Sequence, residues 1–453
     1  MTCMACVALT LGCSAPPSTR NAPPATQPPP RTAQRAGPQA TSQTPAGITT
    51  QPSPRTPADP AAASKAGISH RQLAPSRSSN ATGVWPTKGW RTSAPEEQGM
   101  DAGRLADMLD SARAQGLSLH SVLVIRHGFI VMEKYFGSYD AGTAHSLYSV
   151  TKSFVSALVG IAIRKGLISG VSHPVMGYFP SGTFTGTASA MMSAPQAQVQ
   201  EQAQRARQPR QVASARTSSP FGPGAADSQA SALSKGSITV EDLLTMSSGL
   251  GWLEADETYE RMYTSSRDWV KFVLDTPMAT QPGQSFNYSS GNSHLLSAIV
   301  QKTSRMNTYD FAQANLFRPL GIKDPDWDRD PSGIPIGGWG LTLTPRDMAK
   351  LGYLYLHGGK WEERQVVPAS WVRASTEAHI RIDDMWQYGY QWWLDPGKAY
   401  FAAIGRYGQT ILVVPAQDLV VVFTAHIDSN DSEVDLARKY IIPACASSSS
   451  SDP

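Results

Sequence analysis

The sequence predicts an α+β fold, in which strands from both ends of one domain form a single antiparallel sheet flanked by helices. Residues 121–137, SVLVIRHGFIVMEKYFG, contain two β-rich runs separated by His-Gly, a pattern typical of a hairpin. Residues 388–394, 400–415 and 419–426 near the other end are rich in Val, Ile and Tyr and are separated by Gly, Pro and Asp. The middle of the chain has helical patterns, which predict an all-helical lobe.

The expected helices follow in order along the chain. Apolar residues at helical spacing indicate a helix within residues 96–117, and acidic residues in a first turn indicate another near residue 240. Thr344 followed by Pro345 is typical of a helix start. Further helices are expected at 145–168, 268–276, 292–303, 308–318 and 432–444.

Composition divides the 453 residues into ordered and disordered parts. Residues 14–84 are rich in Pro, Ala and Ser and lack large apolar side chains, so we expect a disordered tether. A low-complexity insert covers about 183–236, and 446–453 form a disordered tail. The remaining parts of 85–445, about 310 to 320 residues, suffice for one large domain or two intimate lobes.

Charge and cysteine usage exclude several classes of protein. The net charge is +3 and no basic patch is interleaved with aromatic residues, so nucleic-acid binding is not expected. The cysteines, Cys3, Cys6, Cys13 and Cys445, indicate neither a disulfide framework nor a zinc site.

The first 13 residues end in MACVALTLGC, which resembles the end of a bacterial lipoprotein signal, although the usual basic region is missing. On this interpretation Cys13 is lipidated, and residues 14–84 tether the domain to a membrane in the bacterial cell envelope; a secreted form is an alternative. The alternative is that these apolar residues occur by chance at the start of a disordered tail.

The stretch HSLYSVTKSFVSALVGIAIRKGLI, residues 145–168, carries the clearest chemistry. Ser149 and Lys152 are three positions apart (i, i+3), so on a helix their side chains lie on the same face. A serine hydroxyl needs a neighbouring base, and a buried lysine becomes one because desolvation lowers its pKa. The apolar residues after Lys152 would supply that burial. An ordinary buried helix with a chance Ser-x-x-Lys is the alternative.

Three motifs in order carry a family resemblance: SVTK at 149–152, YSS at 288–290 and AIGRYGQ at 403–409. Together they resemble the penicillin-recognising serine hydrolases, which have a β-lactamase-like fold. DLLTMSSGL before the second motif and GGWGLTLTPRDMAKLG after it are similar to the class C β-lactamase branch. Within that branch the sequence most resembles 6-aminohexanoate-dimer hydrolase and related esterases.

The resemblance implies a role for each matching residue. Ser149 would form an acyl-enzyme, Lys152 would be the general base, and Tyr288 would pass the proton to the leaving group and later activate water. The backbone N–H groups of Ser149 and Arg406 would form the oxyanion hole, and Gly405 would let the strand approach closely. The resemblance implies no cofactor and no metal.

Other positions bear on the substrate. Ser290 stands where β-lactamases and peptidases of this fold have an Asn that contacts the substrate amide, and Ala403 and Ile404 stand where they have residues that hold a substrate carboxylate. These departures argue against efficient penicillin binding, although Arg406 could restore a positive charge. Trp252, Glu254 and Trp339 lie in loops that border the cleft in this family and could hold an acyl or amide chain; packing is the alternative for these loop residues.

The leading hypothesis is therefore a metal-independent Ser-Lys-Tyr hydrolase that acts on a small-molecule ester or amide. A class C β-lactamase or D-amino-acid peptidase is the enzymatic alternative. A non-catalytic cell-envelope binding protein of the same fold is the alternative from another class. The sequence does not identify the physiological substrate.

Overall fold

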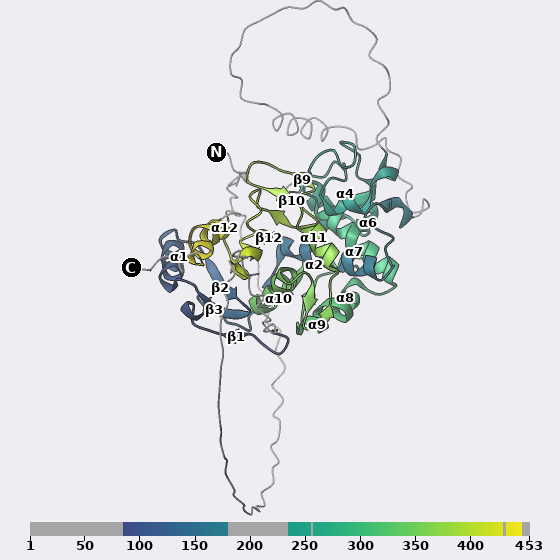
Figure 1. Ribbon diagram of the computed structural model, residues 1–453. Helices are drawn as coiled ribbons and strands as arrows, with labels where there is room; N and C mark the ends of the chain where they lie inside the picture. The colour runs from purple at the N-terminus through teal and green to yellow at the C-terminus, as the bar shows by residue number, and fades with distance from the viewer. Residues whose placement is uncertain (1–84, 180–233, 255–256, 429–431, 446–453) are drawn as a thin grey trace, which may run out of the picture. The chain divides into compact units, whose positions relative to one another are not determined.

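The structure, a computed structural model, describes residues 85–179, 234–254, 257–428 and 432–445 (Figure 1). The predicted signal with Cys13, the tether at 14–84, nearly all of the insert and the tail at 446–453 lie outside these residues. They stay predictions. Within the described part of the chain, every helix is too short or too polar to span a membrane.

A nine-stranded sheet forms the centre, with the strand order β1-β3-β2-β14-β13-β12-β11-β10-β9. All neighbours are antiparallel except β1 and β3, which run parallel. The first strand of the hairpin therefore pairs with the last strand of the chain, and the predicted sheet built from both ends is confirmed. The strands are β1 (Arg91–Thr92), β2 (Leu119–Arg126), β3 (Phe129–Tyr135), β9 (Ile380–Arg381), β10 (Gln387–Tyr388), β11 (Trp393–Leu394), β12 (Phe401–Gly405), β13 (Gln409–Val414) and β14 (Leu419–Ala425).

The sequence explains the predicted hairpin and the burial of both sheet faces. His127 and Gly128 both have positive φ, 51° and 81°, as the two-residue turn of a hairpin requires. Along β2, Leu123 and Ile125 face one apolar cluster, whereas Val122 and Val124 face the other. A central strand with apolar residues at successive positions is therefore covered on both sides.

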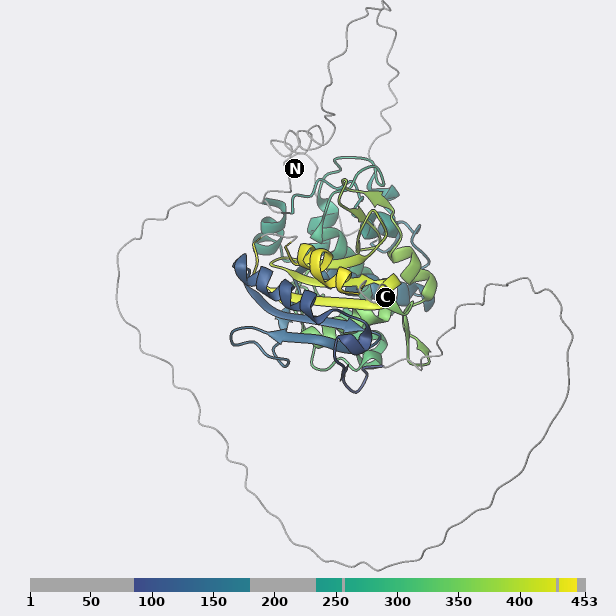
Figure 2. The same cartoon turned by 60° about the vertical axis from the view of Figure 1, so that its left-hand side comes forward.

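Helices cover the two faces in separate layers. One face carries α1 (Ala102–Ala114) and the C-terminal helical turns α12 (Ser432–Leu436), η7 (Ala437–Ile441) and α13 (Ile442–Ala444), which lie side by side in Figure 2. The other face carries α10 (Pro345–Leu356), which begins at the predicted Thr344 cap. A Cβ on Gly352 would come within 2.7 Å of side-chain atoms of Ile411 and Val420, so α10 lies unusually close to the sheet.

The middle of the chain forms the predicted helical lobe. Its helices are α4 (Val240–Leu244), α5 (Glu257–Ser265), α6 (Trp269–Asp275), α7 (Ser290–Ser304), α8 (Thr308–Ala312), η5 (Gln313–Phe317) and α9 (Arg318–Leu320). The segment that returns to the sheet carries α11 (Ala369–Ser375) and the two-stranded sheet β7 (Lys360–Trp361) and β8 (Arg364–Gln365). Short 3-10 turns lie at Glu96–Gln98 (η1), Val175–Gly177 (η3), Lys235–Ser237 (η4) and Pro415–Gln417 (η6).

The helix expected at 145–168 begins later than predicted. His145–Ser146 form strand β4, which pairs with β6 (Leu341–Leu343) next to β5 (Asp326–Trp327). Tyr148–Val150 form a 3-10 turn, η2, and the α-helix α2 covers Thr151–Arg164. Tyr148 has a φ of 45°, which lies outside the range of an α-helix. The strand pairing and this φ value keep the first residues out of the helix.

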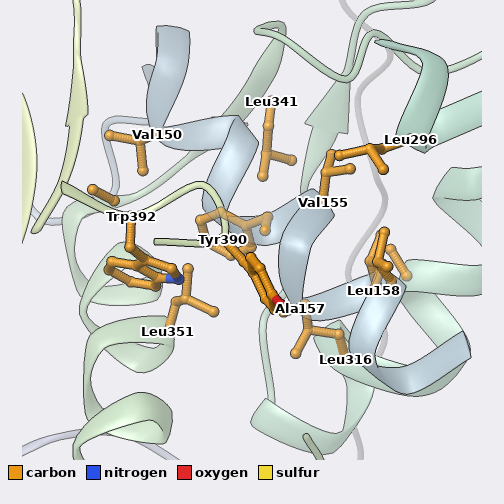
Figure 3. Close-up of a cluster of buried hydrophobic side chains, with 14 of the residues drawn as sticks. Val150, Val155, Ala157, Leu158, Leu296, Leu316, Leu341, Leu351, Tyr390 and Trp392 are labelled. Carbon is orange, nitrogen blue, oxygen red and sulfur yellow. The ribbon is translucent and has the colours of Figure 1, made fainter. Parts of the chain in front are cut away.

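Helix α2 lies in the main apolar core, between the sheet and the lobe. Twelve consecutive residues, Thr151 through Ala162, are buried. Figure 3 shows Val155, Ala157 and Leu158 of α2 beside side chains from other helices and from the loop before β11. This burial holds the N-terminal end of α2 in place, where the reactive residues lie.

Candidate active site

Ser149 and Lys152 lie side by side where η2 passes into α2. The Lys152 Nζ is 3.0 Å from the Ser149 Oγ, so the two side chains are in hydrogen-bond contact. Ser149 is half-buried, whereas Lys152 is only 1% exposed. The arrangement gives an accessible hydroxyl with a buried amine directly behind it.

The Lys152 amine contacts two further oxygen atoms. Its Nζ is 3.0 Å from the Ser290 Oγ and donates to the backbone oxygen of Gly338 at 2.8 Å. Burial lowers the pKa of Lys152 to about 8, although the Glu254 carboxylate acts in the opposite direction. An amine with this pKa is partly neutral near pH 7 to 8 and can accept a proton from Ser149.

Tyr288 completes the group from the segment just before α7. It immediately precedes Ser289, the N-cap of α7, and the Lys152 Nζ lies 4.8 Å from the centre of its ring. Burial and the negative charge of Glu254 raise the pKa of Tyr288, and together they outweigh the opposing effect of the Ser149 hydroxyl. The phenol therefore keeps its proton at neutral pH.

The end of strand β12 lies against the turn that carries Ser149. A Cβ added to Gly405 would come 2.4 Å from the Leu147 backbone oxygen and 3.2 Å from the Ser149 nitrogen, so only glycine allows this approach. Arg406 follows at once and is exposed, with its guanidinium 4.6 Å from the centre of the Tyr407 ring. The predicted neighbours of the Ser149 backbone are therefore in position.

Ser290, Trp252 and Glu254 form a hydrogen-bonded group behind Lys152. Ser290 donates to Glu254 through its backbone N–H at 2.7 Å and through its hydroxyl, and the Trp252 Nε1 donates to the same carboxylate at 2.6 Å. Ser290 is 2% and Trp252 1% exposed. Both side chains are hydrogen-bonded to partners inside the protein, and their expected contact with substrate stays a prediction.

Trp339 belongs to a group of aromatic side chains beside the site. Its ring centre is 4.8 Å from that of Tyr259 and 5.5 Å from that of Trp269. Burial and the charge of Glu254 raise the pKa of Tyr259 to about 12, and the positive charge of Arg406 opposes them. Tyr259 thus lies near both charged groups and Trp339 packs against it, and the expected contact of Trp339 with substrate stays a prediction.

Some residues that hold the site have no signal in the motifs. The Asn287 amide donates to the backbone oxygens of Leu250 and Trp252, at 3.0 Å each, and so fixes the loop before Glu254. Gly338 contributes only a backbone oxygen, which no side-chain pattern reports. Asn287 is adjacent to Tyr288 and could have been noticed for that reason.

Hydrogen bonds from Gln391 join the helical lobe to α2. Its amide donates to the backbone oxygens of Leu243 and Leu244, at 3.1 and 3.0 Å, and its own backbone oxygen accepts from the Ser153 hydroxyl at 2.7 Å. The Gln391 side-chain oxygen accepts from Ser293 of α7 at 2.7 Å.

Among the described residues, no group of three or more His, Cys, Asp or Glu could hold a metal ion.

Comparisons with known proteins show the family of this chain. Residues 102–446 match the family described as Beta-lactamase, which is most of the chain. The chain belongs to the Beta-lactamase family. The 6-aminohexanoate-dimer hydrolase of Paenarthrobacter ureafaciens is 23% identical to this family member over 338 residues, covering 71% of this chain and 75% of the relative.

Solved structures with the same fold include two further relatives of this Beta-lactamase-family chain. A penicillin-binding protein homologue from Caulobacter crescentus has a TM-score of 0.56 at 15% identity, covering 78% of this chain and 99% of that one. EstCE1, a hydrolase with promiscuous acyltransferase activity, has a TM-score of 0.54 at 16% identity, covering 76% and 97%. The predicted β-lactamase-like α+β fold is confirmed.

Proposed function

We propose that this serine hydrolase of β-lactamase-like fold cleaves a small ester or amide through an acyl-enzyme on Ser149, with Lys152 and Tyr288 as its acid–base groups. One observation supports this most directly. The Ser149 hydroxyl is 3.0 Å from an amine whose pKa is lowered to about 8 by burial. A nucleophile paired with a base of suitable pKa is what acyl transfer requires.

The proposed reaction has two halves. In the first, the Ser149 Oγ attacks the carbonyl carbon and its proton moves to Lys152, while the backbone N–H groups of Ser149 and Arg406 stabilise the oxyanion. Tyr288 then gives its phenolic proton to the leaving amine or alcohol and regains one from Lys152. In the second half, a water oxygen attacks the acyl carbon while its proton passes through Tyr288 to Lys152. The bond between the acyl carbon and the Ser149 Oγ then breaks, Lys152 returns the proton to Ser149, and the acid is released.

The raised pKa of Tyr288 favours this division of roles. A phenol that stays protonated is a proton donor and relay, whereas a tyrosinate would have to carry a second charge near Glu254. Lys152 is therefore the base in the proposal. No step needs a metal or an organic cofactor.

A small ester or amide is favoured over a β-lactam as the substrate. Ala403 is 1% exposed and Ser290 2%, so neither supplies the polar contact that the penicillin-recognising relatives are expected to use. The matched 6-aminohexanoate-dimer hydrolase supports an amide, and EstCE1 supports a hydrolase with acyl-transfer chemistry. A β-lactamase or peptidase remains the second candidate because exposed Arg406 could bind a substrate carboxylate.

Purified protein tested with a fluorophosphonate, p-nitrophenyl esters, the linear 6-aminohexanoate dimer and nitrocefin would check the proposal. We expect a Ser149 adduct and ester or amide turnover, with little nitrocefin hydrolysis. Ser149→Ala should abolish turnover, and Lys152→Ala and Tyr288→Phe should each lower it at least about 100-fold, roughly 3 kcal/mol.

Three results would contradict the proposal. A near-normal rate in Lys152→Ala would remove lysine from the mechanism. Absence of any acyl adduct on the wild-type protein would favour the non-catalytic binding protein. Nitrocefin hydrolysis faster than ester hydrolysis would favour the β-lactamase.

A further inference from the structure

The oxygen atoms around Lys152 impose a hydrogen-bond direction on its amine. Its Nζ contacts the Gly338 backbone oxygen at 2.8 Å and the hydroxyls of Ser149 and Ser290 at 3.0 Å each. A neutral amine has two N–H groups and one lone pair, and the Gly338 oxygen can only accept. One hydroxyl must therefore donate to the lone pair while the other accepts an N–H.

Glu254 determines which hydroxyl donates. Its carboxylate only accepts hydrogen bonds, and the Ser290 hydroxyl donates its single proton to the Oε1 atom. The Oε2 atom accepts from two groups that can only donate, the Ser290 backbone N–H at 2.7 Å and the Trp252 Nε1 at 2.6 Å. With its proton on Glu254, the Ser290 hydroxyl can only accept from Lys152.

We propose that Glu254 and Ser290 are positioning residues that set this hydrogen-bond direction, so that the lone pair of neutral Lys152 faces the Ser149 hydroxyl. Neither residue touches the substrate. The inference rests on the proposed function of Ser149 and Lys152. It assigns Glu254 a role through Ser290 that differs from a direct substrate contact and from charge tuning alone.

Glu254→Gln is a sharp test because the orientation of the new amide is fixed. Its oxygen must face the two N–H donors at the Oε2 position, which places its NH₂ group against the Ser290 hydroxyl. The Ser290 hydroxyl then donates its proton to the lone pair of Lys152, and this lone pair can no longer accept the proton of Ser149. We expect the rate of acylation at its high-pH plateau to fall at least about tenfold, within the range of general-base effects.

Ser290→Ala tests the hydrogen-bond direction separately from the charge of Glu254. This variant leaves Lys152 free to accept from Ser149, so its acylation rate should fall only a few-fold, about 2 to 5 times. In Glu254→Gln/Ser290→Ala the misdirected hydroxyl is gone, and the rate should recover to that of Ser290→Ala alone. Such rescue is a non-additive effect, as expected for groups acting through one another.

The pH profile supplies a second readout. Glu254 raises the pKa of Lys152, so removal of its charge should move the rising limb of the rate to lower pH while the plateau falls. If the rising limb of the pH profile shifted while the plateau rate stayed unchanged, Glu254 would act only through its charge, and the inference would be overturned. It would also be overturned if the rate reductions of the two single variants multiplied in the double variant.

Glu241→Gln is the matched control, because Glu241 likewise accepts from a hydroxyl, that of Tyr390 at 2.6 Å, in a pair without Ser149, Lys152 or Ser290. It should keep the wild-type rate and profile. Thermal unfolding of every variant shows whether a slow enzyme is also a misfolded one. If Lys152→Ala itself kept its rate, the proposed function would fail; if only the rescue were absent, the positioning role alone would fail.

Discussion

At the scale of single residues, the ionisation of Lys152 sets the expected pH dependence. Its pKa of about 8 means that the amine is protonated and inactive as a base at pH 6 and mostly neutral at pH 9. The acylation rate should therefore rise through a midpoint near pH 8 and level off. Because the pKa of Tyr288 is raised, the phenol should cause no decline in rate below about pH 10.

Stopped-flow acylation with a p-nitrophenyl ester between pH 6 and 10 would measure this profile. Ester hydrolysis by buffer alone and by Ser149→Ala gives the background at each pH. A midpoint near the ordinary lysine value of 10.4 would show that Lys152 is not desolvated during the reaction, and would contradict the assignment.

The motifs made part of this site predictable from the sequence. Ser149, Lys152 and Tyr288 were expected to converge, and the structure brings them together. The inward direction of Ser290 was not predictable, because its partner Glu254 lies 36 residues earlier in the chain. Residue identity gives a side chain's donors and acceptors, but only the fold decides which of them meet.

At the scale of elements, we expect the close contact between the end of β12 and the turn before α2 to be the contact most sensitive to substitution. Gly405→Ala would place a Cβ 2.4 Å from the Leu147 backbone oxygen, which forces the strand and the turn apart. We expect the acylation rate to fall at least about 100-fold because the oxyanion donors separate, with a loss of roughly 1 to 3 kcal/mol in the free energy of unfolding.

Acylation kinetics and urea unfolding would test this expectation. Gly142→Ala is the control, since its nearest atom would be the Asp140 carboxylate oxygen at 3.5 Å, an ordinary contact. A Gly405→Ala variant with normal kinetics would mean that the strand end does not take part in the oxyanion hole.

The elements that the sequence predicted are those with strong local signals. The predicted Thr344 cap and the His127-Gly128 turn are confirmed, because caps and turns depend on nearby residues. The helix α5, ETYERMYTS, was missed, although Tyr259, Met262 and Tyr263 lie at the helical spacing i, i+3, i+4 and define an apolar face. The late start of α2 was missed because pairing with β6, a distant segment, determines it.

At the scale of the whole molecule, the topology was predictable because both ends of the domain carry β-rich segments. The alignment of the lobe with the sheet was not predictable. It depends in part on Gln391, which is 1% exposed and has a φ of 63°. Nothing in the sequence around it, YGYQWWL, distinguishes this glutamine from a strand residue, and the stretch was predicted to be one strand where the structure has β10 and β11 separated by a turn.

The segments that flank the low-complexity insert pair directly with each other. The Val175 N–H donates to the Ile238 oxygen at 2.8 Å, and the Val240 N–H donates to the His173 oxygen at 3.1 Å. This pairing closes the base of the insert within the described part of the domain. Lys235 belongs to the base as well, because its Nζ donates to the Leu274 oxygen at 2.5 Å.

Replacing residues 185–232 with a short Gly-Ser linker should therefore leave the fold and the acylation rate unchanged. Each halving of a flexible loop lowers its closure entropy by only about 0.6 kcal/mol, so the free energy of unfolding should stay within roughly 1 kcal/mol of wild type or rise slightly. Urea unfolding and ester kinetics on both proteins would measure this.

A control with the same linker and Lys235→Ala tests the paired segments that flank the insert. It should be less stable than the linker variant that keeps Lys235. Loss of soluble protein in the linker variant that keeps Lys235 would mean that the insert takes part in folding, because its paired flanks remain present in that variant.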